Sequence, residues 1–195
     1  MKNNMQRVIG NLVILTPVIV GLVFYNQLPN RVGIHFNVEE QTNGFMDRNL
    51  AIVVLPFIAL VIYNLLFSFF KQITIPFLKE FMLWLIPIFS VVIQGLILTV
   101  ALGGHVQVRL TVIWLVALIF LVIGNYLPKR IGLATKNHNQ INKSVVRELG
   151  YLMIGVSLAL LISLCFNPYT TIMVLGIFIV LILSIVLPNF RYLRK

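Results

Sequence analysis

The chain has 195 residues, of which 59% are hydrophobic and 10% are charged, and its formal net charge is +10. A soluble domain carries about 25% charged residues, so this composition excludes a globular protein with a water-facing surface. The basic excess alone would be compatible with nucleic-acid binding, but the positions of the charges, described below, indicate a membrane protein instead.

Six apolar stretches without Asp, Glu, Lys, Arg or His fill most of the chain. Each is close to the roughly 17–25 residues that a helix needs to cross the hydrocarbon core of a bilayer. The stretches are Val8–Tyr25, Leu50–Phe70, Met82–Leu102, Leu110–Tyr126, Leu149–Phe166 and Thr171–Leu187. We therefore expect an all-α integral membrane protein with six transmembrane helices, located in the cell membrane as a multi-pass protein.

The basic residues predict the orientation of these helices. If both termini are cytoplasmic, all 15 Lys and Arg residues lie in cytoplasmic segments except Arg31, Arg48 and Arg109. This asymmetry follows the positive-inside rule. Lys2 and Arg7 precede the first stretch as in a signal peptide, but no A-x-A cleavage pattern follows. We expect cytoplasmic termini, a retained first helix, and inner loops that lie against anionic lipid rather than nucleic acid.

The loop Asn26–Asn49 is the long outer connection, with the sequence NQLPNRVGIHFNVEEQTNGFMDRN and three of the five acidic residues. We expect Ile34 and Phe36 to dip into the membrane interface while His35 faces the other way. A turn at Asn43 and Gly44 should return the chain to the second span. Such a loop offers apolar groups to a hydrophobic peptide and carboxylates to any cationic end of it. The candidate peptide-binding residues are His35, Phe36, Asn37, Glu39, Glu40, Asn43, Gly44 and Asp47.

Catalytic and metal-binding motifs are missing from the sequence. It contains no nucleotide-binding loop, HExxH, CxxC or G-x-S-x-G motif. His35, His105 and the outer carboxylates are residue types that bind metals, but their spacing matches no metal motif. We expect no enzymatic activity, no cofactor and no metal site. The lack of ionisable side chains within the spans also disfavours proton-coupled transport.

The inner loop Leu127–Glu148 is basic and rich in asparagine, with the sequence LPKRIGLATKNHNQINKSVVRE. It is a candidate docking site for a soluble cytoplasmic partner. The residues that would carry the docking are Lys129, Arg130, Lys136 and Lys143. Pro128 and Pro188 each follow an apolar run by a few residues, and we expect them to end the fourth and sixth helices.

One internal similarity leaves an alternative function open. Residues Asn26–Ile34 (NQLPNRVGI) resemble Asn125–Leu133 (NYLPKRIGL), and three spans separate the two copies. An inverted repeat of this kind is typical of many transporters. A small transporter would require a polar cavity near the middle of the membrane, close to Asn64 and Gln94. The simpler interpretation is that N-x-L-P ends a helix at the membrane interface twice.

The outer loop resembles the N-terminal domain of SdpI-like membrane proteins, which have L-P, an I-x-H-aromatic-N element and an N-G-aromatic turn. The matching positions are Leu28, Pro29, Ile34, His35, Phe36, Asn37, Asn43, Gly44 and Pro56. IGNYLPK, which ends at Lys129, resembles the second signature of the family. Gly33 stands where a second proline is usual, and RIGLATKNHNQINK replaces a GIRTPWTL-like stretch.

The resemblance implies an N-terminal family domain over residues 1–70, with the outer loop 26–49, and a four-span region over residues 71–195. It implies a Gram-positive plasma-membrane protein that protects its producer against a secreted antimicrobial peptide. Some relatives are thought to hold a cytoplasmic transcriptional repressor at the membrane once toxin is bound. Immunity, sensing through such a repressor, and transport are the functions that the sequence leaves open.

Overall fold

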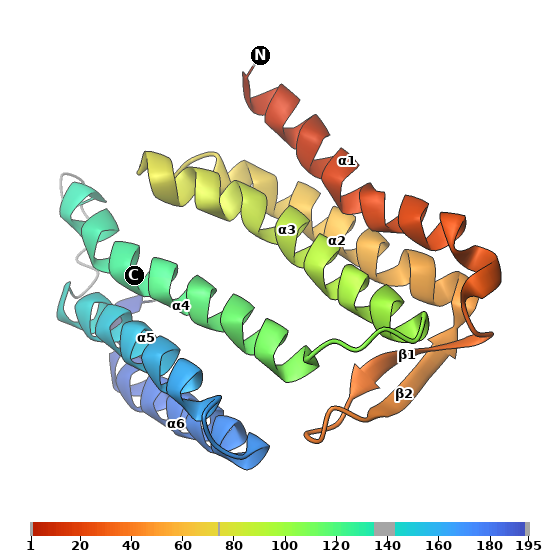
Figure 1. The fold of residues 1–195 in the computed structure, drawn as a ribbon. Helices are drawn as coiled ribbons and strands as arrows, with labels where there is room; N and C mark the ends of the chain where they lie inside the picture. Colours follow the sequence, from red (N-terminus) through yellow and green to blue (C-terminus); the bar gives the residue numbers. More distant parts are fainter. Residues whose placement is uncertain (1, 74, 135–142, 194–195) are drawn as a thin grey trace. The chain divides into compact units, whose positions relative to one another are not determined.

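The computed structural model describes residues 2–73, 75–134 and 143–193. Within these ranges the chain forms six long helices, with a 3-10 turn and two short strands between the first two (Figure 1). In chain order the elements are α1 (Lys2–Val23), η1 (Tyr25–Gln27), β1 (Arg31–Phe36), β2 (Thr42–Asp47), α2 (Arg48–Phe70), α3 (Pro76–Ala101), α4 (Val108–Ala134), α5 (Lys143–Ser163) and α6 (Pro168–Leu193).

All six helices in the described residues are long and apolar enough to cross a membrane. The predicted fold class is confirmed: the protein is a mostly helical, multi-pass membrane protein. Its orientation in the membrane stays a prediction.

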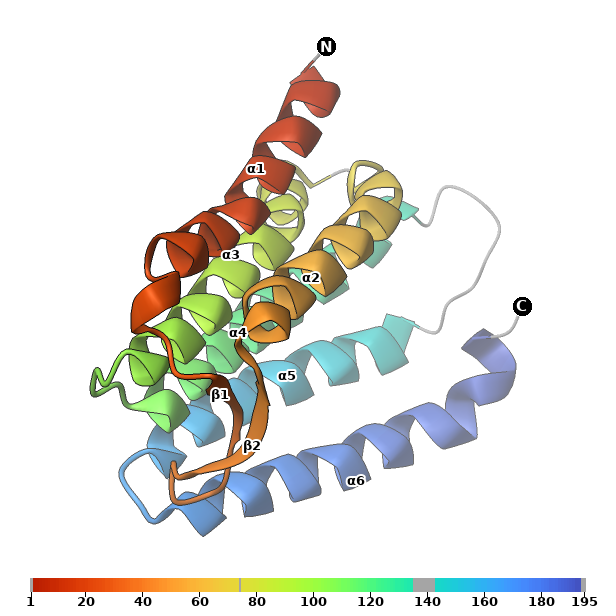
Figure 2. The ribbon, with the colours of Figure 1, turned by 90° about the vertical axis from the view of Figure 1, so that its right-hand side faces the viewer.

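The helices belong to two compact units, Met1–Arg109 and Leu110–Lys195. The first unit contains α1, α2, α3 and the strands, and each of its helices packs against the other two. Figures 1 and 2 both show these three helices side by side, with the strands at the end where α1 finishes and α2 starts. The predicted division of the chain into a family domain, residues 1–70, and a four-span region, residues 71–195, stays a prediction.

The interior of the first unit is apolar near its middle. Ile14 of α1, Tyr63 and Phe67 of α2, and Leu83 of α3 form one buried cluster. The Tyr63 ring lies directly against Gly10 of α1, where any side chain would collide with it. A glycine at this position therefore lets α1 and α2 approach each other closely.

Polar side chains join the same helices at the end away from the strands. Arg7 Nε donates to Asn64 Oδ1 at 2.7 Å, and Asn64 Nδ2 donates to Asn11 Oδ1 at 2.9 Å. Gln6 Nε2 donates to both carboxylate oxygens of Glu80, at 2.8 and 3.0 Å. These bonds connect α1 to α2 and to α3. Because lipid offers polar groups no hydrogen-bond partner, such bonds between helices are favoured.

The second unit is held by close contacts between α4 and α5 and between α5 and α6. Ser157 Oγ donates to the Ala117 carbonyl at 2.8 Å. Gly124 and Gly150 lie where α4 and α5 meet, and a Cβ on Gly150 would stand 2.8 Å from the Gly124 carbonyl oxygen. Gly155, by contrast, is exposed and has nothing within 4 Å of the Cβ position.

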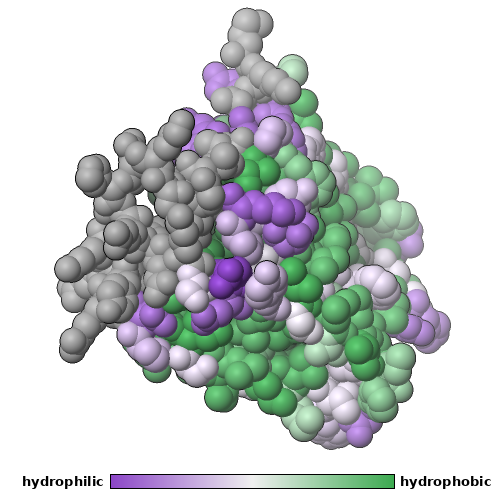
Figure 3. Space-filling view, turned by 90° about the vertical axis from the view of Figure 1, so that its left-hand side faces the viewer, coloured by the Kyte–Doolittle hydropathy of each residue, from purple (hydrophilic) through white to green (hydrophobic). Residues whose placement is uncertain are grey.

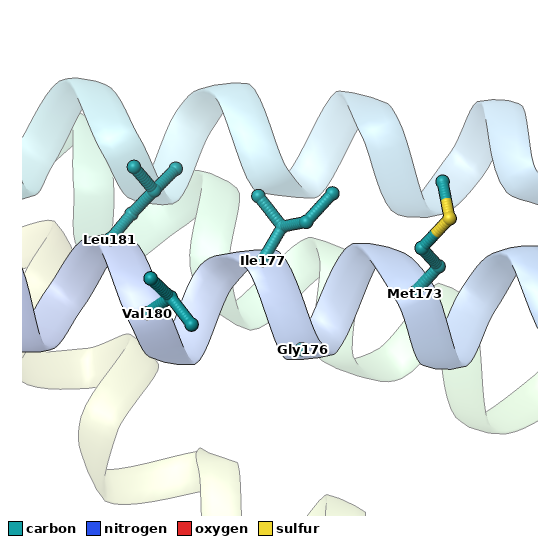
Figure 4. Close-up of a pocket in the computed structure, with 5 residues that line it drawn as sticks. All are labelled: Met173, Gly176, Ile177, Val180 and Leu181. Carbon is teal, nitrogen blue, oxygen red and sulfur yellow. The ribbon is translucent and has the colours of Figure 1, made fainter.

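Apolar side chains dominate the outside of the molecule, as lipid contact requires. In the view of Figure 3, hydrophobic residues cover much of the visible surface. On α6, five residues line a shallow hollow of about 400 Å³: Met173, Gly176, Ile177, Val180 and Leu181. Figure 4 shows Met173, Ile177 and Leu181 in a row along this helix. All these residues are exposed and apolar, so lipid is the expected environment of the hollow.

Each helix begins before the matching apolar stretch, and two predicted helix ends are wrong. Pro128 lies inside α4 and Pro188 lies inside α6. Proline is tolerated within membrane helices because neighbouring groups satisfy the carbonyl that it frees. The two copies of the internal similarity also differ in structure, since Arg31–Ile34 is part of a strand and Arg130–Leu133 is helical.

Candidate functional site

The connection between α1 and α2, predicted to be an outer loop, forms an antiparallel β-hairpin, which the sequence did not predict. Arg31 pairs with Asp47, Val32 with Met46, Gly33 with Phe45, His35 with Gly44, and Phe36 with Thr42. The register shifts around His35, as in a β-bulge. Asn43 and Gly44 lie within β2 rather than at a turn, so the predicted turn is wrong.

Both glycines of the hairpin lie at close contacts that explain their positions. A Cβ on Gly44 would stand 2.8 Å from the Cβ of His35, its partner at the bulge. A Cβ on Gly33 would collide with the Thr42 side chain. Gly44 therefore serves the strand pairing, whereas the sequence suggested that it made a turn.

The real turn covers residues 37–41 and is organised by Asn37. The Asn37 side-chain oxygen accepts from the backbone N–H of Glu39 at 3.0 Å and of Gln41 at 2.8 Å. Glu40 has a φ of 62°, a backbone conformation in which asparagine or glycine is more usual. Its carboxylate accepts from the backbone N–H of Arg109 at 2.5 Å. Asn37 and Glu40, both predicted as peptide-binding residues, thus make bonds that fix the tip of the hairpin.

The base of the hairpin is held by residues at the start of α2. The Asp47 side chain accepts from the Asn49 backbone N–H at 2.9 Å and so caps the helix. Arg48 donates to the carbonyls of Tyr25 and Leu28, at 3.1 and 3.0 Å. Its guanidinium also lies over the Tyr25 ring, 4.1 Å from the centroid. These contacts fasten the end of the first helical segment to the beginning of the second.

Buried side chains seat the hairpin on the helices. Val32 of β1 is 0% exposed and packs with Ala51 of α2 and Ile97 of α3. Leu28, just before β1, packs with Ile52 and Leu98 of the same two helices. The hairpin is therefore anchored along β1, whereas β2 contacts only β1 and α2 among the packed pairs of elements.

The outer surface of the hairpin combines apolar groups with a carboxylate. Phe45 is 52% exposed and Ile34 is 36% exposed. His35 Nδ1 and Asn43 Oδ1 are hydrogen-bonded at 2.5 Å, and both side chains are exposed. Within the described hairpin, Glu39 is the exposed carboxylate whose oxygens make no hydrogen bond to the protein. Phe36 is only partly exposed.

Sequence reasoning missed two residues of this site. Phe45 belongs to the N-G-aromatic pattern, but only its exposure on β2 makes it a candidate contact. In the sequence, Arg48 is one of three basic residues predicted to lie outside. In the structure, Arg48 bonds to two backbone carbonyls, whereas Arg31 is exposed. Arg48 directly follows Asp47, a helix-capping residue type, and this position could have indicated that Arg48 lies at the start of a helix.

The structure describes little of the predicted cytoplasmic docking residues. Lys129 lies on α4, with Nζ 3.3 Å from Asn125 Oδ1 and 4.7 Å from the centroid of the Tyr126 ring. Lys136 and the side chains of Arg130 and Lys143 lie outside the described residues. Docking of a partner there stays a prediction. Among the described residues, no three His, Cys, Asp or Glu side chains are grouped so that they could hold a metal ion.

The fold and the site define a multi-pass helical membrane protein with a structured hairpin between its first two helices. Residues 12–60 match the family model described as "Domain of unknown function (DUF1648)". The matched region covers the second half of α1, the whole hairpin and the first half of α2. No curated protein matches the chain, and no solved structure matches it. The comparisons therefore draw attention to the hairpin and its neighbours without assigning them an activity.

Proposed function

We propose that this protein is an SdpI-like immunity protein, which binds a secreted hydrophobic toxin peptide at its outer hairpin and so protects the cell. The observation that carries the proposal is the hairpin itself, fixed at its base and tip and exposing Phe45, Ile34 and Glu39. The resemblance of its LP, IHFN and NG residues to the SdpI-like pattern supplies the class of ligand. The role is one of binding, without a catalytic step.

The form of the hairpin suits an extended apolar peptide. A two-stranded sheet has unpaired backbone groups along the outer edge of each strand, and a peptide can add to such an edge as a further strand. The edge of β2 is the better candidate, because β1 is the strand that packs on α2 and α3. Phe45, exposed on β2, would then cover the apolar side chains of the added peptide.

The fixed geometry of the hairpin favours binding. A loop that orders only on contact loses about 0.5–1.5 kcal/mol for each side chain that it immobilises. Here Asn37, Asp47 and Arg48 already hold the backbone by hydrogen bonds. The ligand therefore meets a surface that is largely formed in advance.

The charge of the hairpin supports a peptide with a cationic end. Two of the three hairpin carboxylates, on Glu40 and Asp47, already accept backbone hydrogen bonds. The Glu39 carboxylate remains available to attract a positive charge from solution. Such attraction raises the association rate and weakens as salt increases.

A transporter with a shared polar cavity has less support. Gln94 donates to the Ala51 carbonyl, whereas Asn64 bonds with Asn11 and Arg7. Ala51 and Asn64 are 13 residues apart on α2, which corresponds to about 20 Å along a helix. The two polar groups that would have formed one central cavity thus belong to separate places in the first unit.

The test is survival of a sensitive Gram-positive strain that expresses the chain, challenged with a panel of secreted antimicrobial peptides. We expect the wild-type chain to raise survival against at least one peptide. Phe45→Ser and Glu39→Gln should lower this protection at equal amounts of protein in the membrane. Tyr169→Ser, at an aromatic residue of the second unit that is 61% exposed, and Arg31→Gln are matched controls. Unchanged killing across the panel would refute the proposal, and equal losses in the controls would refute the assignment of the site.

A further inference from the structure

Two polar atoms in the first unit are buried without a partner. Ser90 and Gln94 of α3 are both 0% exposed. Ser90 Oγ and Gln94 Oε1 make no hydrogen bond in the structure. Buried polar atoms are nearly always paired with protein or with ordered water, so these two atoms call for a partner. The observation is independent of the outer hairpin surface and of the proposed function.

The orientation of the Gln94 amide is fixed by its neighbour. Gln94 Nε2 donates to the Ala51 carbonyl at 2.8 Å. The reversed amide would place two oxygens against each other, so Oε1 must be the atom that faces away from Ala51. An amide oxygen only accepts hydrogen bonds, and it therefore needs a donor from another direction.

Ser90 lies one helical turn before Gln94, on the same face of α3. Residues four apart on a helix have Cβ atoms about 5–6 Å apart. That spacing suits one water molecule, which can donate to Gln94 Oε1 and bond to Ser90 Oγ at the same time. A hydroxyl can donate or accept, so the second bond can form in either direction.

Two buried prolines leave further hydrogen-bond acceptors without donors in α2 and α3. Pro56 of α2 and Pro87 of α3 are both fully buried, below 2% exposure. Proline has no N–H, so the carbonyls four residues earlier, on Ile52 and Leu83, lose their helical donors. α2 and α3 thus hold acceptors that their own backbone does not satisfy, and a buried water is a group that can donate to such acceptors.

We propose that a single buried water molecule bridges Ser90 Oγ and Gln94 Oε1 inside the first unit and joins α3 to α2 beside the Gln94–Ala51 bond. Ala51, whose carbonyl accepts from Gln94, packs with Val32 and Ile97. The two atoms to be bridged belong to neutral side chains, which suit water. A globular protein holds on the order of one buried water per 27 residues, usually with about three hydrogen bonds.

The experiment is water-edited solid-state NMR on the full chain in lipid bilayers, with ¹⁵N-glutamine labelling. The Gln94 side-chain signal is identified by its disappearance in Gln94→Met. We expect magnetisation to pass from water to the Gln94 amide in the wild-type protein, and we expect Ser90→Ala to abolish this transfer. Ser157→Ala is the matched control, because that hydroxyl bonds directly to a carbonyl in the second unit. It should leave the transfer unchanged.

A thermal-unfolding cycle gives a second, independent measure. If water bridges the two side chains, the shift in midpoint of the double variant Ser90→Ala, Gln94→Met should be smaller than the sum of the single shifts. Additive shifts, or an absence of transfer in the wild-type spectrum, would overturn the proposal. A signal that changes when Na⁺ is exchanged for K⁺ would also overturn it, since a bound cation would then occupy the place.

Discussion

Arg48 makes the polar contacts that hold the base of the hairpin, and Arg48→Met tests how much they contribute. The change removes the guanidinium bonds to the Tyr25 and Leu28 carbonyls, at 3.1 and 3.0 Å, and the contact with the Tyr25 ring. A hydrogen bond to a charged group contributes about 1.5–3 kcal/mol. Because both bonds are only partly buried, we expect the two together to contribute less than the sum of two such bonds. We expect the free energy of unfolding to fall by about 2–3 kcal/mol.

The measurement is reversible unfolding in mixed micelles, followed by circular dichroism, together with hydrogen exchange of the hairpin amides. Arg31→Met is the control, because it removes a basic residue of the same hairpin that is exposed. We expect faster exchange over residues 31–47 in Arg48→Met and wild-type exchange in Arg31→Met. If the two variants unfold alike and exchange alike, Arg48 does not brace the hairpin and the reasoning fails.

Three further predictions concern stability, measured by the same unfolding assay. Gly150→Ala should lower the free energy of unfolding by about 1–3 kcal/mol, because its Cβ would press on a backbone carbonyl of α4; Gly155→Ala, which has open space, should not. Asp47→Ala should cost about 1 kcal/mol through loss of the α2 cap, and Asp47→Asn should restore most of it. Ser157→Ala should cost about 0.6 kcal/mol, the average for such membrane bonds, and a loss above about 2 kcal/mol would contradict this account.

The six helices were predictable from the sequence because lipid imposes a simple requirement on composition. A run of about 20 residues without charge marks a spanning helix whatever it packs against. The ends were less predictable, as Pro128 shows. Its ring lies against Gly150 of the neighbouring helix, where a Cβ on Gly150 would be 2.8 Å from Pro128 Cγ. Proline at this point fits a helix contact, and no local pattern distinguishes that role from a helix stop.

The roles of the hairpin carboxylates were not predictable from the sequence. Glu39 and Glu40 are neighbours of the same type, yet the positive φ of Glu40 directs its carboxylate to the Arg109 backbone while Glu39 stays exposed. Asp47, predicted as a peptide-binding residue, also caps a helix. These differences follow from the turn and the strand register, which depend on Asn37 and on pairing between distant residues.

The region that matches the domain of unknown function does not contain its whole core. Residues 12–60 end within α2, yet Val32 and Leu28 are buried against Ile97 and Leu98 of α3, which lie outside the match. Without α3, the side chains of Val32 and Leu28 would lose these contacts and the stabilisation that comes from burying them. The hairpin therefore takes its fixed shape from α3 as well as from α1 and α2. The compact unit that contains the hairpin together with these packing partners is Met1–Arg109.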